Sequence, residues 1–183
     1  MTDSPPDDQS TVEVEFRAVF RAELGWVCNT LRRLGVREAD VEDAAHDVFV
    51  TFHRRIADYD PARPVRAWLG GIAYRTASDH RRRAHVRREI ADDTLDPVDP
   101  RGGADEALVD EERRALVIAA LQQVRDERRP VLVLHDIDGL PMPAIAESLS
   151  IPLNTAYSRL RLARADFRRA VEALRERDDE ATG

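Results

Sequence analysis

Residues 138–164 read DGLPMPAIAESLSIPLNTAYSRLRLAR, a stretch that predicts two helices joined by a tight turn. Pro143 suits a first helical turn, because its missing N–H would have no partner there. Ile145, Ala146 and Leu149 then follow at the spacing of a buried helical stripe. Residues 150–153, SIPL, form the predicted turn.

The second helix of this stretch has two distinct sides. Asn154 or Thr155 is expected to cap it. Its predicted inner side carries Ala156, Leu160, Ala163 and Phe167, and its outer side carries Arg161, Arg164 and Arg168. A short helix, a turn and a second helix with an arginine-bearing outer face are typical of a helix-turn-helix.

Seven side chains of the second helix are predicted to contact duplex DNA: Asn154, Thr155, Tyr157, Ser158, Arg159, Arg161 and Arg164. Arginine pairs with guanine edges in the major groove, and hydroxyls hold phosphate. The alternative is a solvated face with ordinary charge pairs along the helix. Carboxylates are almost absent from this helix, so partners for such pairs are missing and DNA contact is favoured.

The distribution of charge along the chain also favours DNA binding, although the net charge is −7. Residues 75–88 hold six arginines against Asp79, and residues 154–170 hold five against Asp166. Between these basic clusters, residues 89–112 hold ten acids against Arg101. Clustered basic surfaces are the usual footprint of a phosphate backbone. We hypothesise that the acidic segment shields both clusters in the free protein.

Upstream of residue 138 the chain also reads as helical. Apolar residues recur every three or four positions over 16–34, before Gly35, and again over 41–56; a third helix starts near Trp68 and runs into the arginine cluster. No segment alternates as a strand does, so the fold is expected to be all-α. The expected parts are a disordered tail (1–11), a helical domain (12–88), a flexible acidic linker (89–104), a small helix-turn-helix domain (105–175) and a second tail (176–183).

Other classes of protein are disfavoured. The single cysteine, Cys28, allows no intrachain disulfide, and no apolar run is long enough to span a bilayer. The first ten residues do not resemble a secretory signal, so we expect a cytoplasmic protein without membrane insertion. No nucleophile stands with a base, and the spacing around His46 and His135 does not suit a metal. We therefore expect no catalytic residue, no metal and no cofactor.

Three motifs carry a family resemblance. Residues 138–164 resemble the promoter-binding helix-turn-helix of the extracytoplasmic-function (ECF) sigma factors of the sigma-70 family. Residues 40–49, DVEDAAHDVF, resemble the family's polymerase-binding helix. Residues 66–73, RAWLGGIA, followed by DHRRR at 79–83, resemble its promoter-melting helix. The three motifs stand in family order over residues 12–88 and 105–175.

The resemblance implies roles for two further groups of residues. The residues implied to hold the melted −10 element are Tyr74, Arg75, Asp79, Arg81, Arg82 and Arg83, and those implied to dock on core RNA polymerase are Asp40, Glu42, Asp43, His46, Asp47 and Phe49. The helix-turn-helix would read the −35 element. The family often has Asn at position 75, an apolar residue at 81 and Gln at 46, where this chain has Arg75, Arg81 and His46.

The resemblance also implies the partners. They are core RNA polymerase, promoter DNA and an anti-sigma factor, with the chain itself a monomer that performs no catalysis. Two other interpretations stay open at this point: a stand-alone helix-turn-helix regulator, and a protein-interaction module whose arginine helices bind acidic partners. Tight duplex binding without polymerase would favour the first, and no DNA binding even with polymerase would favour the second.

Overall fold

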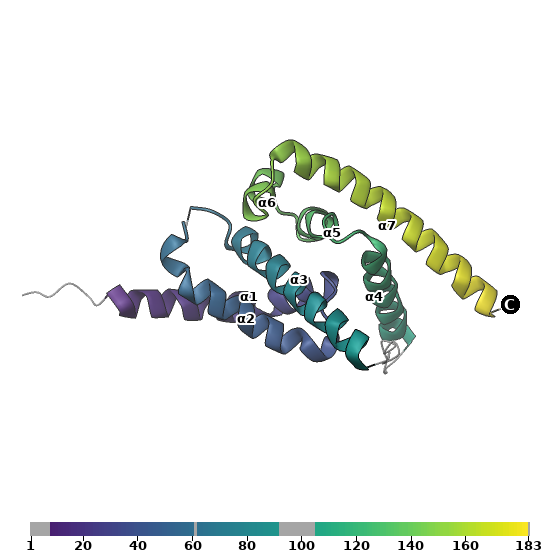
Figure 1. Cartoon of the computed structure of the whole chain (residues 1–183), viewed down its shortest axis with the longest axis horizontal. Coiled ribbons are helices and arrows are strands. Elements are labelled where there is room, and N and C mark those ends of the chain that lie inside the picture. Colours follow the sequence, from purple (N-terminus) through teal and green to yellow (C-terminus); the bar gives the residue numbers. More distant parts are fainter. Residues whose placement is uncertain (1–7, 61, 92–104, 183) are drawn as a thin grey trace, which may run out of the picture.

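The computed structural model describes residues 8–60, 62–91 and 105–182, and within these ranges all regular structure is helical, which confirms the all-α class. In chain order the elements are α1 (Asp8–Arg33), η1 (Glu38–Asp40), α2 (Val41–Arg54), η2 (Ile56–Asp58), α3 (Val65–Ala91), α4 (Asp105–Gln123), α5 (Arg129–Leu132), η3 (Val133–Ile137), α6 (Met142–Ser148) and α7 (Leu153–Thr182). Figure 1 shows α1, α2 and α3 side by side, with α6 over one end of α3 and the long α7 running past α6, α5 and α4 on their outer side.

Several helices extend beyond the expected bounds. Helix α1 begins at Asp8, inside the stretch expected to be a tail, and α7 runs to Thr182 through the second expected tail. Helix α3 continues to Ala91, past the expected start of the linker. The rest of that linker, residues 92–104, lies outside the described residues.

The N-terminal half is a three-helix packing unit. Helix α2 turns a fully apolar side inward, with Val41, Ala44, Ala45, Val48, Phe49 and Phe52 all buried. Helix α1 ends in a Schellman motif: the Val36 N–H donates to the Leu31 carbonyl at 3.0 Å, and the Gly35 N–H donates to Arg32 at 3.0 Å. Gly35 has φ +91°, a conformation that costs glycine nothing and lets the chain turn sharply into α2.

The C-terminal half contains the predicted helix-turn-helix. Helix α5 runs directly into η3, a π-helical turn, and Gly139 with φ +69° ends it. Helix α6 also ends in a Schellman motif, in which the Ile151 N–H donates to the Ala146 carbonyl at 2.9 Å. Ser150 holds the left-handed position of that motif, at φ +56°. The turn then leads into α7 at Leu153, so Asn154 and Thr155 lie in its first turn and the prediction that either caps it is wrong.

One hydrophobic core runs through both halves. The same cluster holds Leu31, Val48 and Ile72 from the N-terminal half and Leu134, Ile145 and Leu160 from the C-terminal half. All of these side chains are at most 4% exposed. The two helical domains expected from the sequence are both present, and in this structure they pack directly on each other.

Candidate nucleic-acid interface

The first turns of α7 present polar side chains to solvent. Asn154, Tyr157, Ser158 and Arg161 are exposed, and the Tyr157 side chain stands 52% exposed, which is high for an aromatic residue. The residues predicted for the inner side behave as expected: Ala156, Leu160 and Ala163 are buried, and Phe167 packs against the core. Thr155 and Arg159 are partly buried between the two sides. The amphipathic period of the sequence therefore gives the correct face.

Arg164 has a partner that its own helix did not reveal. Its guanidinium donates two hydrogen bonds, each 2.7 Å long, to the Asp136 carboxylate in η3. Hydrogen bonding from Arg164 lowers the pKa of Asp136, burial opposes this, and His135 adds to the lowering. The expectation that the arginines of this face lack ion-pair partners is wrong for Arg164, because the partner comes from another element.

The basic part of α3 divides between solvent and interior. Arg82 and Arg83 are exposed, with Arg82 2.6 Å from Asp79. Arg81 instead reaches the interior: its side chain is only 19% exposed and its guanidinium donates to the Leu34 carbonyl. The inward direction of Arg81 suits a position at which the family resemblance implies an apolar residue.

The other two residues of this set, Tyr74 and Arg75, also make internal contacts. The partly buried Tyr74 packs against the hydrophobic core. Arg75 is exposed overall, yet its guanidinium donates to the Ser148 carbonyl of α6 at 3.2 Å. Local desolvation, and secondarily the charge of Arg55, lowers the pKa of Arg75.

Helix α2 exposes its acids and buries its aromatic residue. Glu42, Asp43, His46 and Asp47 are exposed; Asp40, just before the helix, is partly buried and lies 2.8 Å from Arg37. Phe49 is 3% exposed and packs edge-on against Phe20, with ring centroids 4.7 Å apart. In this structure Phe49 is a packing residue, whereas the acids form an accessible surface.

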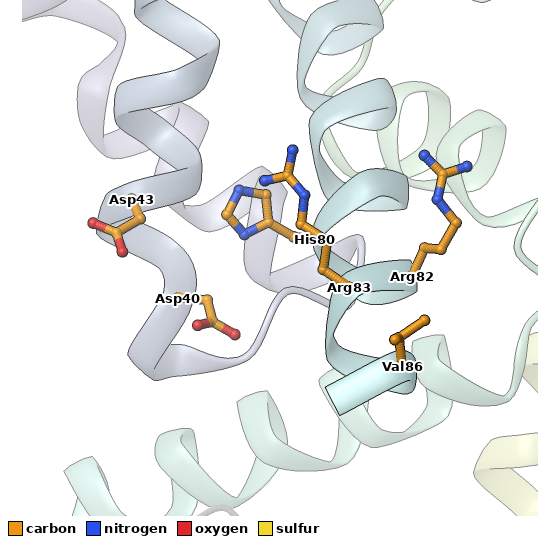
Figure 2. Close-up of a pocket in the computed structure, with 6 residues that line it drawn as sticks. All are labelled: Asp40, Asp43, His80, Arg82, Arg83 and Val86. Carbon is orange, nitrogen blue, oxygen red and sulfur yellow. The ribbon is translucent and has the colours of Figure 1, made fainter. Parts of the chain in front are cut away.

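The predicted polymerase-binding and DNA-binding residues meet at one place. An open pocket of about 650 Å³ lies between α2 and α3, lined by Asp40, Asp43, His80, Arg82, Arg83 and Val86. Figure 2 shows Asp43 on α2, Asp40 just before the start of α2, and the other four residues on α3, which faces them. The His80 ring nitrogen lies 3.1 Å from the Asp47 carboxylate, which ties the same two helices together.

An aromatic cluster that was not predicted from the sequence lies near the loop after α2. The Tyr59 and Trp68 rings lie 5.1 Å apart, and the Arg55 guanidinium sits 5.9 Å from the Trp68 ring centroid. The Tyr59 hydroxyl donates to the Arg63 carbonyl at 3.0 Å, which braces the loop. The sequence feature that could have indicated this cluster is Tyr59, the one aromatic residue in the stretch DYDPAR at 58–63.

The described residues contain neither a candidate metal site nor a candidate membrane-spanning helix. No group of three or more His, Cys, Asp or Glu side chains there is arranged to hold a metal ion. None of the helices described combines the length and the apolar character needed to cross a membrane.

Comparison with known proteins identifies both halves. Residues 19–87 match the family model for Sigma-70 region 2, and residues 114–167 match that for Sigma-70, region 4. The chain is 30% identical over 150 residues to the RNA polymerase sigma factor CnrH of Cupriavidus metallidurans, covering 78% of each. It is 30% identical over 138 residues to the ECF RNA polymerase sigma factor SigE of Mycolicibacterium smegmatis, covering 74% of this chain and 53% of SigE.

Solved structures give the same result. CnrH in complex with the cytosolic domain of CnrY aligns with a TM-score of 0.63 and 25% identity, covering 88% of this chain and 90% of CnrH. RpoE of Bartonella quintana, in complex with the anti-sigma factor NepR, shares the fold, with a TM-score of 0.66, 16% identity and coverage of 86% and 97%. The chain therefore belongs to the ECF sigma factors of the sigma-70 family, non-catalytic DNA-recognition proteins that direct promoter-specific initiation by RNA polymerase.

Proposed function

We propose a division of this sigma-factor activity among three surfaces of the chain. The exposed first turns of α7 read the −35 element as duplex, the exposed end of α3 holds the melted −10 element, and the acids of α2 dock on core polymerase. The observation that carries the assignment is the outward face of α7, where Tyr157, Ser158 and Arg161 stand exposed beside one another on a helix whose opposite side is buried. A recognition helix presents such a face to the major groove.

The basic end of α3 suits single-stranded DNA. Arg82 and Arg83 provide charge for phosphates, and exposed Val86 provides an apolar surface beside them. Arg81 is excluded from this contact in the present arrangement, because its guanidinium faces Leu34 and Asp126. We assign residues 12–88 to polymerase binding and promoter melting, and residues 105–175 to −35 recognition.

We also propose where the chain acts and which partners it binds. The chain acts where RNA polymerase acts, in the cytoplasm, contributes no catalytic group of its own, and joins polymerase as a monomer. Two sigma factors of the same fold were solved bound to a partner, one to the cytosolic domain of CnrY and one to the anti-sigma factor NepR. By that likeness we expect an anti-sigma partner for this chain.

The decisive experiment is reconstitution. Purified protein is mixed with sigma-free core RNA polymerase of the same organism, and genomic DNA is transcribed and its start sites mapped. Discrete new starts that depend on the protein support the proposal. Sequence-specific duplex binding without polymerase, and no new starts with it, would favour the stand-alone regulator.

A matched pair of arginines on α7 tests the −35 assignment. Arg161 lies in the first turns and Arg175 lies near the far end, and both are exposed. Arg161→Ala is expected to weaken holoenzyme binding to the mapped promoter by about 1–3 kcal/mol if it reads a base. Arg175→Ala is expected to leave the binding unchanged. Equal effects of the two substitutions would contradict the assignment.

A further inference from the structure

Two arginines from different halves of the chain converge on one carbonyl oxygen. Arg81 of α3 and Arg129 of α5 both donate to the carbonyl of Leu34, the residue directly after α1. Their side chains are 19% and 5% exposed, so both guanidinium groups lie largely away from water. Two like charges this close repel each other, and burial makes the charged state less favourable still. The pair is therefore stable only with negative charge beside it.

A single carboxylate serves both guanidinium groups. Within residues 8–60, 62–91 and 105–182, the carboxylate that contacts them is that of Asp126, with one oxygen 3.4 Å from Arg81 and the other 3.1 Å from Arg129. The Asp126 side chain is 62% exposed, so water weakens its attraction for the two cations. In the described part of the chain, two buried positive charges thus face one solvated negative charge.

The pKa of Arg129 reflects this shortage of negative charge. Burial lowers the pKa of Arg129, Asp126 opposes the change, and the neighbouring charge of Arg81 adds to the lowering. A lowered pKa means that the charged form of Arg129 is less favourable here than in water. A further anion beside the pair would stabilise that charged form.

Both arginines also have unused hydrogen-bond donors. The Nε atoms of Arg81 and Arg129 are buried and have no hydrogen-bond partner among the described residues. A buried N–H without an acceptor is unfavourable, and such groups are commonly satisfied by a bound ion or water. The same two side chains thus call for both an acceptor and a negative charge.

A third side chain completes the surroundings of the pair. A Cβ atom on Gly35 would lie 2.6 Å from Gln122 Oε1, 2.8 Å from Arg129 Nη1 and 3.2 Å from Arg81 Cδ, so these side chains gather around one point. Gln122 and Asp126 are both exposed, which places them on the solvent side of the arginines. The amide of Gln122 can donate as well as accept, so it adds a donor at this edge.

A tetrahedral oxyanion is the ligand that suits these groups. A guanidinium presents its N–H groups in a planar fork that matches two oxygens of a phosphate. Two guanidiniums and an amide can donate to several oxygens of such an ion, whereas chloride offers a single acceptor atom. The oxyanion would supply the missing negative charge and the missing acceptors together.

We propose that this chain binds a free tetrahedral oxyanion, inorganic phosphate in the cell, between Arg81 and Arg129, with Asp126 at the entrance as its competitor. One arginine comes from each half, so the site is complete only in the folded chain, and its occupancy raises the free energy of unfolding. The site does not depend on which surfaces bind promoter DNA. It also gives Arg81 a partner other than DNA.

Two substitutions with opposite expected effects test the site. Arg81→Leu removes one guanidinium and is expected to abolish binding. Asp126→Asn removes the competing charge and is expected to tighten binding about fivefold, which is the factor that a largely exposed ion pair contributes. The matched controls are Arg82→Leu and Glu127→Gln, which make the same changes at the adjacent, exposed positions and are expected to leave the affinity unchanged.

Isothermal titration calorimetry and thermal unfolding of the full-length free protein measure the binding. Phosphate and sulfate are titrated while sodium chloride holds the ionic strength constant. Both ions are expected to bind the wild type and to raise its unfolding temperature in a saturable way. Their exclusion from protein surfaces also stabilises folded proteins in general, but that effect does not saturate and is shared by every variant.

AMP distinguishes a free ion from a phosphate ester. The two arginines, Gln122 and Asp126 approach the ion from several directions, so a nucleoside on one oxygen would displace one of them. AMP is therefore expected to show no saturable binding at this site. Equal binding of AMP and phosphate would overturn the assignment to a free ion.

The other outcomes also decide the proposal. Absence of saturable binding by the wild type would overturn it, and so would unchanged binding by Arg81→Leu, because the ion would then lie elsewhere. If Arg81→Leu does not fold, Asp126→Asn decides alone, since its side chain is exposed. Weaker or unchanged phosphate binding by Asp126→Asn would show that Asp126 is not a competitor and would overturn the site.

Discussion

Arg164 on α7 and Asp136 in η3 form a bidentate pair, with both hydrogen bonds 2.7 Å long, across 28 positions of sequence. The fork of a guanidinium matches both oxygens of a carboxylate, so this geometry is more specific than a single contact. The pair fixes the π-helical turn against α7. Arg164, which is predicted from the sequence to contact DNA, is thus bound to a carboxylate in this structure.

Removal of this pair should alter the response to acid. Arg164 lowers the pKa of Asp136 below its ordinary value of 3.8, so the pair stabilises the fold fully above that value and is lost as pH falls through the lower, folded-state pKa. Wild-type protein should therefore be more stable than Asp136→Asn at neutral pH, and this advantage should shrink below about pH 4. Urea unfolding at several pH values measures the difference. A difference independent of pH would contradict the ion-pair role.

The same substitution should strengthen non-specific DNA binding. Asp136→Asn releases the Arg164 guanidinium, which then becomes available to a phosphate. The affinity for duplex DNA should rise, and the slope of log affinity against log salt should steepen by about 1. Titration of a random duplex at several salt concentrations gives that slope. An unchanged slope would mean that Arg164 does not reach the phosphates.

Substitution of Arg129 should lower the free energy of unfolding more than substitution of an exposed arginine does. It is 4% exposed and donates to the carbonyls of Leu34, Gln122 and Val124 at 2.9 to 3.1 Å. A lysine keeps the charge but lacks the fork that reaches all three, so Arg129→Lys should lower the free energy of unfolding by about 2 kcal/mol. Chemical denaturation measures the loss. Arg125→Lys, at an exposed position, is the control and should change it by less than about 0.5 kcal/mol.

Two glycines with positive φ should differ in their tolerance of alanine. Gly35 and Gly139 have φ +91° and +69°, so both changes strain the backbone by about 1 kcal/mol. At Gly139 nothing lies within 4 Å of the added atom, whereas at Gly35 it would meet Gln122 Oε1 at 2.6 Å and Arg129 Nη1 at 2.8 Å. Thermal unfolding should show a clearly larger loss for Gly35→Ala. Equal losses would show that Gln122 and Arg129 adjust freely.

Polymerase docking and core packing can be separated on α2. Phe49→Ala leaves a cavity in the hydrophobic core and should lower the free energy of unfolding by about 3 kcal/mol. Asp43→Ala changes an exposed side chain and should leave stability within about 0.5 kcal/mol while weakening the complex with core polymerase. Denaturation and co-elution with polymerase measure the two effects. Unimpaired co-elution of Asp43→Ala would remove this acid from the docking surface.

Local rules predicted much of this molecule. The spacing of apolar residues predicted the inward side of α7, and Gly35 predicted the end of the first helix. The stretch that contains Pro143 predicted the helix-turn-helix. Each of these features depends on residues within a few positions of one another, which is the range over which helix patterns carry information. The exposed face of α7 was predicted from the same spacing of nearby residues.

Long-range contacts account for what the sequence did not predict. Arg81 reads as one more cation in a basic run, yet it turns inward to Leu34, 47 positions away. Arg164 finds Asp136 in a different element, and Gly70 and Gly71 serve a close approach of α6 that no local pattern indicates. Such contacts depend on how whole helices pack, because spacing along the chain does not determine which segments meet.

The carbonyl oxygen of Leu34, the residue directly after α1, accepts hydrogen bonds from both Arg81 and Arg129, so a single acceptor joins the end of α1 to α3 and α5. A hybrid sigma factor could join the N-terminal half of this chain to the C-terminal half of another family member. In such a hybrid this chain would keep Leu34 and Arg81 but meet whatever the other parent carries in place of Arg129. A C-terminal half transplanted into such a hybrid would therefore need an arginine at the place of Arg129 to restore this hydrogen bond to Leu34.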